Sequence, residues 1–557
     1  AQALGDNSDY QKFLTRAQDW ENLYNPADGY LEPRNLDGSF ASPYNPSSGS
    51  GWVESNGAQY EWMIPFNLGG LFAASGGNTK VNQRLDSFFT QLNAGPGMPY
   101  AFLGNEPTIE TPWEYDYAGS PYKTQKVVRE AVNTLWMPGP EGLPGNDDLG
   151  TMSSWYVFAA IGMFPETPGN ATLVLDSPLF PTITLHRPGG QTIQINAPGA
   201  SASTYYIQSL KVNGQSSTKP WLPPSFVQTG GTLDFTLSGS PNTTWGAAAT
   251  DAPPSFQYGE VPTLVSFNPS RAVVVPGKTT QTSIFAENIG SSASSVSWTA
   301  TAPSGLTITP TSGSFTVPAG STGSQPLTVT AAANTGEGYY RISFSAQNSS
   351  GTTLPPLTML VVVAQSGSLL PFYDNVGISN DNSSSAADYD GDGFSYSAQQ
   401  LSQIGYTPGA TVTVNGISYT WPNVAAGSYD NIEASGQTIP LPNAKTGATQ
   451  LTFLGSATNG PSDGTVTITY TDGSSTTAQL GFSDWTLNAG SSSPSYNNVV
   501  AAKTAYRNSS GGSPDTTTTY LFATAAISLD STKQVASVTL PSSVNSGTLH
   551  IFAVAVS

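Results

Sequence analysis

The chain has no cysteine and only two histidines, His186 and His550, among its 557 residues. The absence of cysteine excludes disulfides, thiolate nucleophiles and cysteine-based zinc sites. Two histidines so far apart in the sequence argue against a histidine-bound metal and against a Ser-His-Asp triad. The groups left to carry chemistry are carboxylates, amides, hydroxyls and metals bound by oxygen.

Charge is also scarce, because Asp, Glu, Lys and Arg make up 10% of the chain, against about 25% in an average soluble domain. A surface covered mainly by Ser, Thr, Asn, Gln and Gly is common in exported proteins. The net charge is −19, which repels nucleic acid and anionic lipid. No run of about 18 apolar residues is present to span a bilayer. We therefore expect a secreted or cell-surface protein without a nucleic-acid partner.

Length and pattern predict a multidomain α + β protein. Within residues 1–168, the stretch 122–136 is predicted to be an amphipathic helix. The stretch 152–163 is predicted to be a helix that is apolar nearly all round and therefore buried. Long loops rich in Trp and Tyr join the helical segments, which suits a helical barrel whose loops build one pocket.

From residue 169 the pattern changes to the short alternating runs of strands. Residues 169–250 are expected to form a small β region that closes the helical unit, and residues 251–261 a linker. An immunoglobulin-like β-sandwich is predicted for residues 262–365. A jelly-roll-like β-sandwich is predicted for residues 366–557, and carbohydrate binding is one hypothesis for this last unit.

Three segments of the helical part place acids among aromatic residues: 52–62, 104–119 and 145–156. One reason for such a pattern is glycoside cleavage. Aromatic faces stack on the apolar faces of sugar rings, one protonated carboxyl donates to the leaving oxygen, and one carboxylate activates water. On this hypothesis Trp52 and Trp113 contact the sugar.

Glu54 suits the acid, because an apolar setting between Trp52 and Tyr60 would keep a carboxyl protonated. The pair Asp147 and Asp148 precedes a predicted helix, whose first N–H groups would keep a carboxylate ionised. Asp147 could equally be a helix cap.

Structural alternatives apply to other acidic and aromatic residues of these segments. Glu114 and Asp116 could simply be hydrogen-bonded to neighbouring loops, and Glu61 could be a solvated charge on a helix face. Trp52, Trp113 and Trp155 could all be core residues, and Trp155, on the predicted buried helix, is expected to be one.

The sequence closely resembles glycoside hydrolase family 92, the calcium-dependent exo-α-mannosidases, over about residues 29–246. The matching motifs stand in the family's order: GYLEPRNLDG at 29–38, ESNGAQYEWMIP at 54–65, GNEP at 104–107, YDYAG at 115–119, PYKTQ at 121–125 and GNDDLGTMSSWY at 145–156. Several long motifs in the same order are more specific than a single short pattern.

This resemblance implies part of an (α/α)6 barrel and an inverting mechanism. Glu54 matches the family's general acid and Asp148 its general base, and Asn146 stands where some members have a second acidic residue that assists the base. Asn105 and Glu106 match positions that face the substrate. The family's calcium is expected to have ligands among Gln59, Asn105, Glu106 and backbone carbonyls, where a hard cation bound by oxygens can orient two sugar hydroxyls.

Two departures from the family matter. Residues 108–112 differ from the continuation found in members specific for α-1,2 linkages, so the linkage is not assigned. The chain also starts inside the family's catalytic domain, after its N-terminal β-sandwich and first barrel helices. We therefore expect an N-terminal companion polypeptide, or a segment of the same precursor, to complete the pocket.

A second calcium site is predicted in the C-terminal unit. The stretch DYDGDGFSY at 388–396 spaces Asp388, Asp390 and Asp392 as in a calcium loop, although Gln399 replaces the usual glutamate. The alternative is a turn rich in Asp and Gly.

These observations predict a calcium-dependent α-mannosidase that acts on terminal mannose of glycans. Two alternatives remain open. One is a non-catalytic glycan-binding or surface-scaffold protein, and the other is a family member that cleaves mannose-1-phospho linkages.

Overall fold

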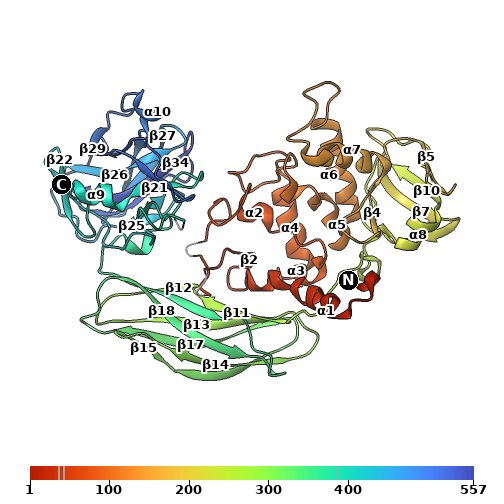
Figure 1. Ribbon diagram of the computed structural model, residues 1–557, viewed down its shortest axis with the longest axis horizontal. Coiled ribbons are helices and arrows are strands. Elements are labelled where there is room, and N and C mark those ends of the chain that lie inside the picture. Colours follow the sequence, from red (N-terminus) through yellow and green to blue (C-terminus); the bar gives the residue numbers. More distant parts are fainter. Residues whose placement is uncertain (36–37, 42–43, 386) are drawn as a thin grey trace.

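The computed structural model describes residues 1–35, 38–41, 44–385 and 387–557. Its units follow one another along the chain, with a helical region, a small sheet, a long β-sandwich and a C-terminal β unit (Figure 1). Leu36 and Asp37, which belong to the motif at 29–38, lie outside the described residues.

The helical region contains the elements that hold the acidic segments. Its helices are α1 (Asn7–Arg16), α2 (Gly57–Tyr60), α3 (Leu68–Ala74), α4 (Asn78–Phe88), α5 (Glu114–Tyr117), α6 (Pro121–Thr134) and α7 (Thr151–Ile161). The predicted helices at 122–136 and 152–163 are confirmed as α6 and α7. Proline at the first position of α6 fits the start of a helix, where its missing N–H has no intrahelical partner.

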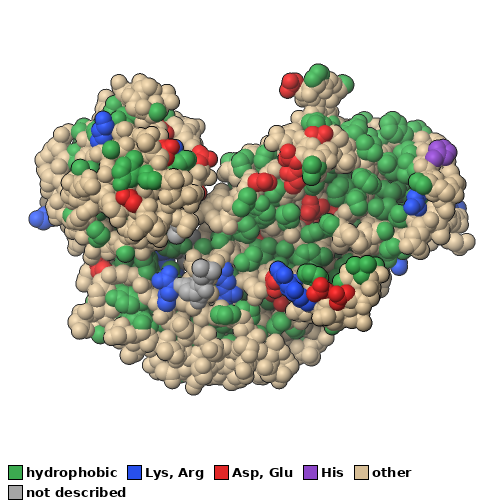
Figure 2. Space-filling model, in the orientation of Figure 1, with side chains coloured by type: hydrophobic (Ala, Val, Ile, Leu, Met, Phe, Trp, Pro, Cys, Tyr) green, Lys and Arg blue, Asp and Glu red, His purple; other side chains and the backbone are tan. Residues whose placement is uncertain are grey.

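The environment predicted for α7 is partly wrong. Met152 and Trp155 are buried, but Ser153, Ser154 and Val157 are exposed, with Val157 at 54%. When a helix is apolar on all sides, its sequence pattern does not indicate which face packs against neighbouring elements. The pattern therefore could not identify the exposed face of α7. Figure 2 shows hydrophobic side chains gathered over the helical region on this side of the molecule.

A five-stranded sheet follows the helices, in the order β5-β6-β10-β7-β8. Its strands are β5 (Thr182–His186), β6 (Thr192–Asn196), β7 (Tyr206–Val212), β8 (Gln215–Ser217) and β10 (Gly231–Ser238), with α8 (Pro224–Thr229) before the last. A small sheet of β3 (Met163–Phe164), β4 (Leu173–Leu175) and β9 (Trp221–Leu222) connects it to α7. The short strands predicted from residue 169 onward are confirmed here, for example as β5 and β6.

Two sheets with one shared hydrophobic core form the long β-sandwich. One sheet contains β11 (Thr263–Asn268), β13 (Thr279–Asn288), β17 (Ser321–Ala331) and β15 (Leu306–Thr309). The other contains β12 (Arg271–Val274), β19 (Leu357–Val363), β18 (Gly338–Gln347), β14 (Ser294–Thr301) and β16 (Ser312–Val317). The polar/apolar alternation of these strands, such as β18, directs one face of each sheet inward.

The sandwich is attached to the helical region by buried contacts. Leu264 of β11 belongs to the helical core. The Gln18 side chain donates to the carbonyl of Phe256 at 2.8 Å, and the Glu21 carboxylate accepts from the N–H of Val261 at 3.0 Å. These bonds hold the segment before β11 against residues 18–21, which follow α1.

The C-terminal unit has two larger sheets around a common core. The first contains β24 (Ile432–Glu433), β34 (Thr548–Val556), β26 (Gln450–Thr458), β31 (Thr519–Ala523), β29 (Val499–Thr504) and β32 (Ile527–Ser528). The second contains β25 (Thr438–Pro440), β33 (Val535–Thr539), β27 (Ser462–Tyr470) and β28 (Ser475–Phe482).

Smaller elements lie at the side of this unit. They are β20 (Ile378–Ser379), β21 (Phe394–Ser397), α9 (Ala398–Gln403), β22 (Thr411–Val414), β23 (Ile417–Thr420), α10 (Leu487–Gly490) and β30 (Arg507–Ser509). The structure therefore confirms helices followed by β units, whereas the (α/α)6 barrel, the immunoglobulin-like and the jelly-roll assignments stay predictions.

No helix of the described residues is both long enough and apolar enough to pass through a bilayer.

Candidate active site

The loop that carries Glu54 is held by the residues on its C-terminal side. Asn56 caps α2 by accepting from the N–H of Gln59 at 3.1 Å, and its amide donates to the carbonyls of Pro96 and Met98. Gln59 is fully buried, and its amide donates to the carbonyl of Met98 as well and to those of Gly95 and Tyr100. Two buried amide side chains therefore fasten this loop to the next one.

Glu54 itself is exposed and has a φ of 70°. Trp52 stacks on Tyr60 at 5.1 Å between ring centroids and 14° between planes. The Tyr60 hydroxyl donates to the carbonyl of Val53. The apolar setting predicted for Glu54 is therefore wrong for this structure, because the two aromatic rings pack on each other and leave the carboxyl in solvent.

The loop 104–106 contacts both other acidic segments. The Asn105 amide donates to the carbonyl of Glu54 at 3.3 Å. Gly104 and Gly145 approach so closely that a Cβ on Gly145 would lie 2.0 Å from the carbonyl oxygen of Gly104. Asn93 joins the same backbones, because its amide donates to Pro144 and its carbonyl accepts from the N–H of Gly104. The loops of Glu54, of Asn105 and of Asp148 therefore meet in one region.

The two adjacent aspartates behave differently. Asp147 accepts from the N–H of Ser153 at 2.8 Å and from its hydroxyl at 2.6 Å, and the hydrogen bonds from Ser153, first the hydroxyl and then the N–H, lower the pKa of Asp147. The capping alternative for Asp147 is thus confirmed. Helix N–H groups were predicted to hold one carboxylate of this pair, and in the structure the N–H of Ser153 bonds Asp147 and not Asp148.

Backbone conformation explains this exchange. Leu149 and Gly150 both have positive φ, 52° and 81°, so the chain reverses between the aspartates and α7. The turn directs Asp147 to the third residue of the helix and leaves the Asp148 side chain exposed. Asn146 is exposed beside them, and the exposed side chain of Leu149 follows.

The predictions for Trp113 and Glu61 are wrong, because both side chains are buried. Trp113 has no exposed surface, stacks on Phe164 at 4.1 Å and meets Trp155 edge-on at 5.3 Å. It is therefore core and does not present a face to a sugar. Glu61 was predicted to be solvated, but it is 1% exposed, accepts from the N–H of Leu31 at 2.8 Å and pairs with Arg84 at 3.2 Å.

The helical region also contains buried carboxyl groups that lie near one another. Glu114 and Glu166 are buried, and none of their carboxyl oxygens has a hydrogen-bond partner among the described residues. Burial raises the pKa of both, and nearby Glu110 raises it further. The prediction that Glu114 is hydrogen-bonded to neighbouring loops is wrong. Nothing in the sequence marks Glu166, which lies 52 positions away from Glu114, as its neighbour.

Two parts of the chain match models of known protein families. Residues 1–239 match the model described as the glycosyl hydrolase family 92 catalytic domain. We refer to residues 1–239, which resemble this family, as the family 92 part. Residues 365–557 match the model described as an AziU2-like beta-sandwich domain.

Individual relatives of the family 92 part come from a fungus and a bacterium. A protein of Arthroderma benhamiae described as an uncharacterized secreted glycosidase is 27% identical over 282 residues, which are 46% of this chain and 36% of that protein. A GH92 alpha-mannosidase of Bacteroides thetaiotaomicron is 32% identical with a TM-score of 0.43, over 46% of this chain and 34% of its own. An inverting GH92 mannosidase of the same species is 28% identical with a TM-score of 0.42, over 46% and 37%. The chain thus spans little more than a third of the length of these relatives.

Of the side chains expected to bind calcium in the family 92 part, some have oxygen atoms free to act as ligands and one does not. Gln59 does not fit, because its amide nitrogen donates to three carbonyls and its oxygen accepts from Ser55. Asn105 and Glu106 do fit, since the Asn105 oxygen and the Glu106 carboxylate have no hydrogen-bond partner in the described part of the chain and both residues are partly exposed. Calcium takes oxygen ligands of this kind.

The predicted calcium loop of the C-terminal unit is instead a closed turn. Asp388 accepts from the N–H groups of Gly391 and Gly393, and Asp390 accepts from those of Asp392 and Phe394. The remaining oxygen of Asp390 pairs with Arg507 at 3.2 Å. Within the described ranges, no three acidic or histidine side chains converge as metal ligands. The turn alternative therefore fits, and the arginine occupies the place where a cation would be needed.

Proposed function

We propose that this chain carries the C-terminal part of the catalytic domain of an inverting, calcium-dependent exo-α-mannosidase that acts on terminal α-mannosides of glycans. The family match of residues 1–239 supports glycoside hydrolysis, and the mannosidase names of the bacterial relatives support the sugar. The single observation that carries the proposal is the contact of loop 104–106 with both the Glu54 loop and the Asp148 loop.

In this proposal Glu54 donates a proton to the glycosidic oxygen as the bond to the anomeric carbon breaks. Asp148 accepts a proton from the water that attacks the opposite face of the sugar. The two carboxyl groups of an inverting enzyme stand about 6.5–9.5 Å apart so that this water fits between them. Asp147 has a positioning role, because its bonds to Ser153 hold the turn before α7. Asn146 can bond the water but has no carboxylate to accept its proton.

The sugar is bound in this proposal by Asn105, Glu106 and Trp52. Asn105 and Glu106 would also hold the calcium ion, which when bound orients sugar hydroxyls and polarises them. Exposure of Glu54 and Asp148 agrees with a site that other chain segments still have to enclose.

The proposal includes a companion segment, either a separate N-terminal polypeptide or part of the same precursor. The chain covers only 36% of its fungal relative, and apolar side chains of the helical region such as Val53, Met137 and Val157 are more than half exposed. Such side chains are the usual contacts of a protein interface. Secretion or cell-surface attachment is part of the proposal, in line with the description of the fungal relative as secreted.

We further propose the following division of the chain. Residues 1–168 belong to an (α/α)6 barrel, 169–250 close the catalytic unit and 251–261 are a linker. Residues 262–365 form an immunoglobulin-like sandwich, and 366–557 form a jelly-roll-like sandwich.

The test measures mannose release by the chain together with its companion segment, on unactivated α-mannobioses and on 2,4-dinitrophenyl α-mannoside. Glu54→Gln should lower kcat on the mannobioses by about 100- to 10,000-fold. Its effect on the dinitrophenyl substrate should be much smaller, because that leaving group needs no proton. Asp148→Asn should abolish hydrolysis of both substrates.

The matched control is Glu130→Gln, which removes one exposed carboxylate from α6 and should change neither rate. Wild-type rates in Glu54→Gln or in Asp148→Asn would refute the assigned roles. An enzyme that cleaves mannose 1-phosphodiesters but not mannobioses, with little effect of Glu54→Gln, would favour the phospho-linkage alternative.

A further inference from the structure

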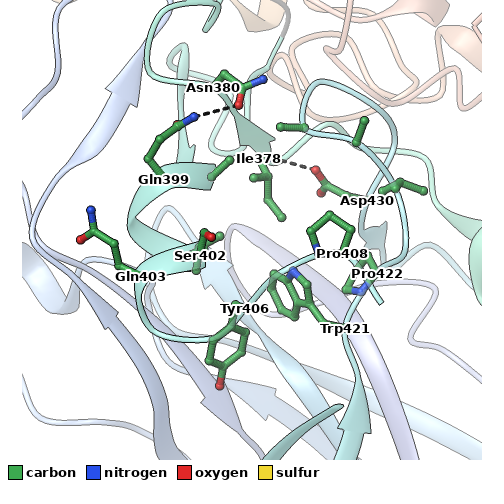
Figure 3. Close-up of a pocket in the computed structure, with 15 residues that line it drawn as sticks. Ile378, Asn380, Gln399, Ser402, Gln403, Tyr406, Pro408, Trp421, Pro422 and Asp430 are labelled. Carbon is green, nitrogen blue, oxygen red and sulfur yellow. Dashed lines mark hydrogen bonds between the residues drawn. The ribbon is translucent and has the colours of Figure 1, made fainter. Parts of the chain in front are cut away.

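A cavity of about 550 Å³ opens in the C-terminal unit, well separated in sequence from the family 92 part. Helix α9 forms one side of it, and the segment 421–426 forms the other (Figure 3). Ile378, Leu401 and Trp421 are buried at its floor, whereas Ser402 and Gln403 are exposed at its rim. Its volume lies within the range of about 300–1,000 Å³ that is usual for small-molecule sites.

The aromatic floor is preformed. Trp421 stacks on Phe552 with ring centroids 4.9 Å apart and planes 18° apart. Tyr406 meets the Trp421 ring edge-on at 4.9 Å, and its hydroxyl donates to the carbonyl of Ala501 at 2.9 Å. Because each ring is held by a second one or by a hydrogen bond, a ligand would find the floor in place without reordering it.

The cavity offers no available charge. Asp430 is the one ionisable acid or base, tyrosine aside, among its lining residues, all of which are described. Its carboxylate accepts from the N–H groups of Gly377 and Ile378 and from the amide of Asn431, at 3.1, 2.9 and 2.7 Å. Burial also raises the pKa of Asp430 to about 7. An ionic ligand would therefore meet no counter-charge and would lose its hydration.

The rim offers neutral hydrogen-bonding groups. Gln399 is engaged, because its amide donates to Asn380 at 3.0 Å and its oxygen accepts from the N–H of Asp381 (Figure 3). The oxygen of Gln403 accepts from Gln400. These bonds leave the amide nitrogens of Asn380 and Gln403 and the hydroxyl of Ser402 without a partner among the described residues. A purely apolar ligand would leave these groups unused or bury them unpaired.

We propose that this cavity binds one residue of a neutral saccharide. A sugar ring has an apolar C–H face that suits the accessible Pro408 and Val424 side of the cavity, and hydroxyls that suit the amides of the rim. Absence of available charge excludes uronic acids and amino sugars as preferred ligands. The C-terminal unit would in this way bind glycan through a site of its own, independent of the hydrolytic site.

The test uses the full chain carrying Glu54→Gln, with methyl α-mannoside and methyl β-glucoside as neutral probes. Saturation-transfer NMR at millimolar concentration should detect at least one of them. Ser402→Trp, which fills the mouth of the cavity, should lower the affinity by about tenfold or more. Ile404→Trp is the matched control, because Ile404 is exposed just past the end of α9 and does not line the cavity, and it should keep the affinity.

Asn380→Ala and Gln403→Ala test the rim without filling the cavity, and each should lower affinity several-fold. Glucuronate and glucosamine should bind more weakly than the neutral glycosides. The proposal is overturned if neither neutral glycoside binds, if Ser402→Trp retains full affinity, or if the charged sugars bind as well as the neutral ones. Displacement of the glycoside by hexanol at lower concentration would likewise overturn it in favour of an apolar ligand.

Discussion

The side-chain amide of Asn105 donates to the backbone carbonyl of Glu54 at 3.3 Å, across 51 positions of sequence. Glu54 has a φ of 70°, a conformation that residues other than glycine rarely adopt because the side chain crowds the backbone. The hydrogen bond from Asn105 therefore helps to hold Glu54 in an intrinsically unfavourable backbone conformation.

Loss of this bond should weaken proton donation by Glu54 more than it weakens binding of the sugar. We expect Asn105→Ala to lower kcat on α-mannobiose by about tenfold or more, with a smaller loss on the dinitrophenyl mannoside, which needs no acid. The measurement is the ratio of kcat on the two substrates. An equal loss on both would show that Asn105 acts only through binding, and Asn82→Ala, which removes a similar amide bond at Ala118, should change neither.

Asp147 should act as a cap and not as the base. Asp147→Ala removes the acceptor for the N–H of Ser153, so it should lower the melting temperature by a few degrees. Asp147→Asn keeps an acceptor and should retain most of that stability. Scanning calorimetry and mannose release distinguish the roles. If Asp147→Asn were as inactive as Asp148→Asn while equally stable, Asp147 would have to share the chemistry of the base.

The buried carboxyl groups should make the helical region less stable at alkaline pH. Burial raises the pKa of Glu110 to about 7, against about 4.3 in an unfolded chain. The folded state therefore holds this proton more tightly, so the stabilisation is complete below about pH 4 and is lost as pH rises through about 7.

Removal of that charge should flatten the pH profile. Glu110→Gln should raise the free energy of unfolding at pH 9 by up to about 3 kcal/mol and change it little at pH 4. Urea denaturation at both pH values measures the effect, with Glu141→Gln as the exposed control. Parallel profiles for Glu110→Gln and the parent would contradict the assignment.

The turn at 388–396 should be stable without calcium. Arg507 pairs with buried Asp390 at 3.2 Å and with Asp515 at 3.0 Å. Arg507→Met leaves the Asp390 charge unpaired and should cost about 3 kcal/mol, measured by denaturation of the full chain. Asp392→Asn should not alter any shift in melting temperature that calcium causes. A reduced calcium shift in Asp392→Asn would restore the calcium-loop hypothesis for this turn.

Local patterns predicted the elements well where one residue spacing dominates. Helix α6 and strands β5 and β6 lie where the spacing of apolar residues puts them, because period and burial agree there. The motifs around Glu54, Asn105 and Asp148 also predicted that these segments belong to one family. Secondary structure and sequence motifs depend on residues that are close together in the chain, so they can be predicted without knowledge of distant contacts.

Burial of particular acids and rings was not predictable in this way. Trp113 and Glu61 stand among the same residue types as Trp52 and Glu54, yet the first two are buried and Glu54 is exposed. The difference depends on contacts with Phe164 and Arg84, which come from other segments.

The sequence by itself limited the class of chemistry, since a chain without cysteine and with two isolated histidines is left with carboxylates, amides, hydroxyls and metals bound by oxygen. It also determined the order of helical and β units and the motifs of the hydrolase family. Only the tertiary structure decided that Asp147 caps α7 while Asp148 stays exposed, and that Arg507 neutralises the Asp390 turn. Spacing along a chain does not specify which charge meets which partner, because that depends on where distant backbones bring their side chains together.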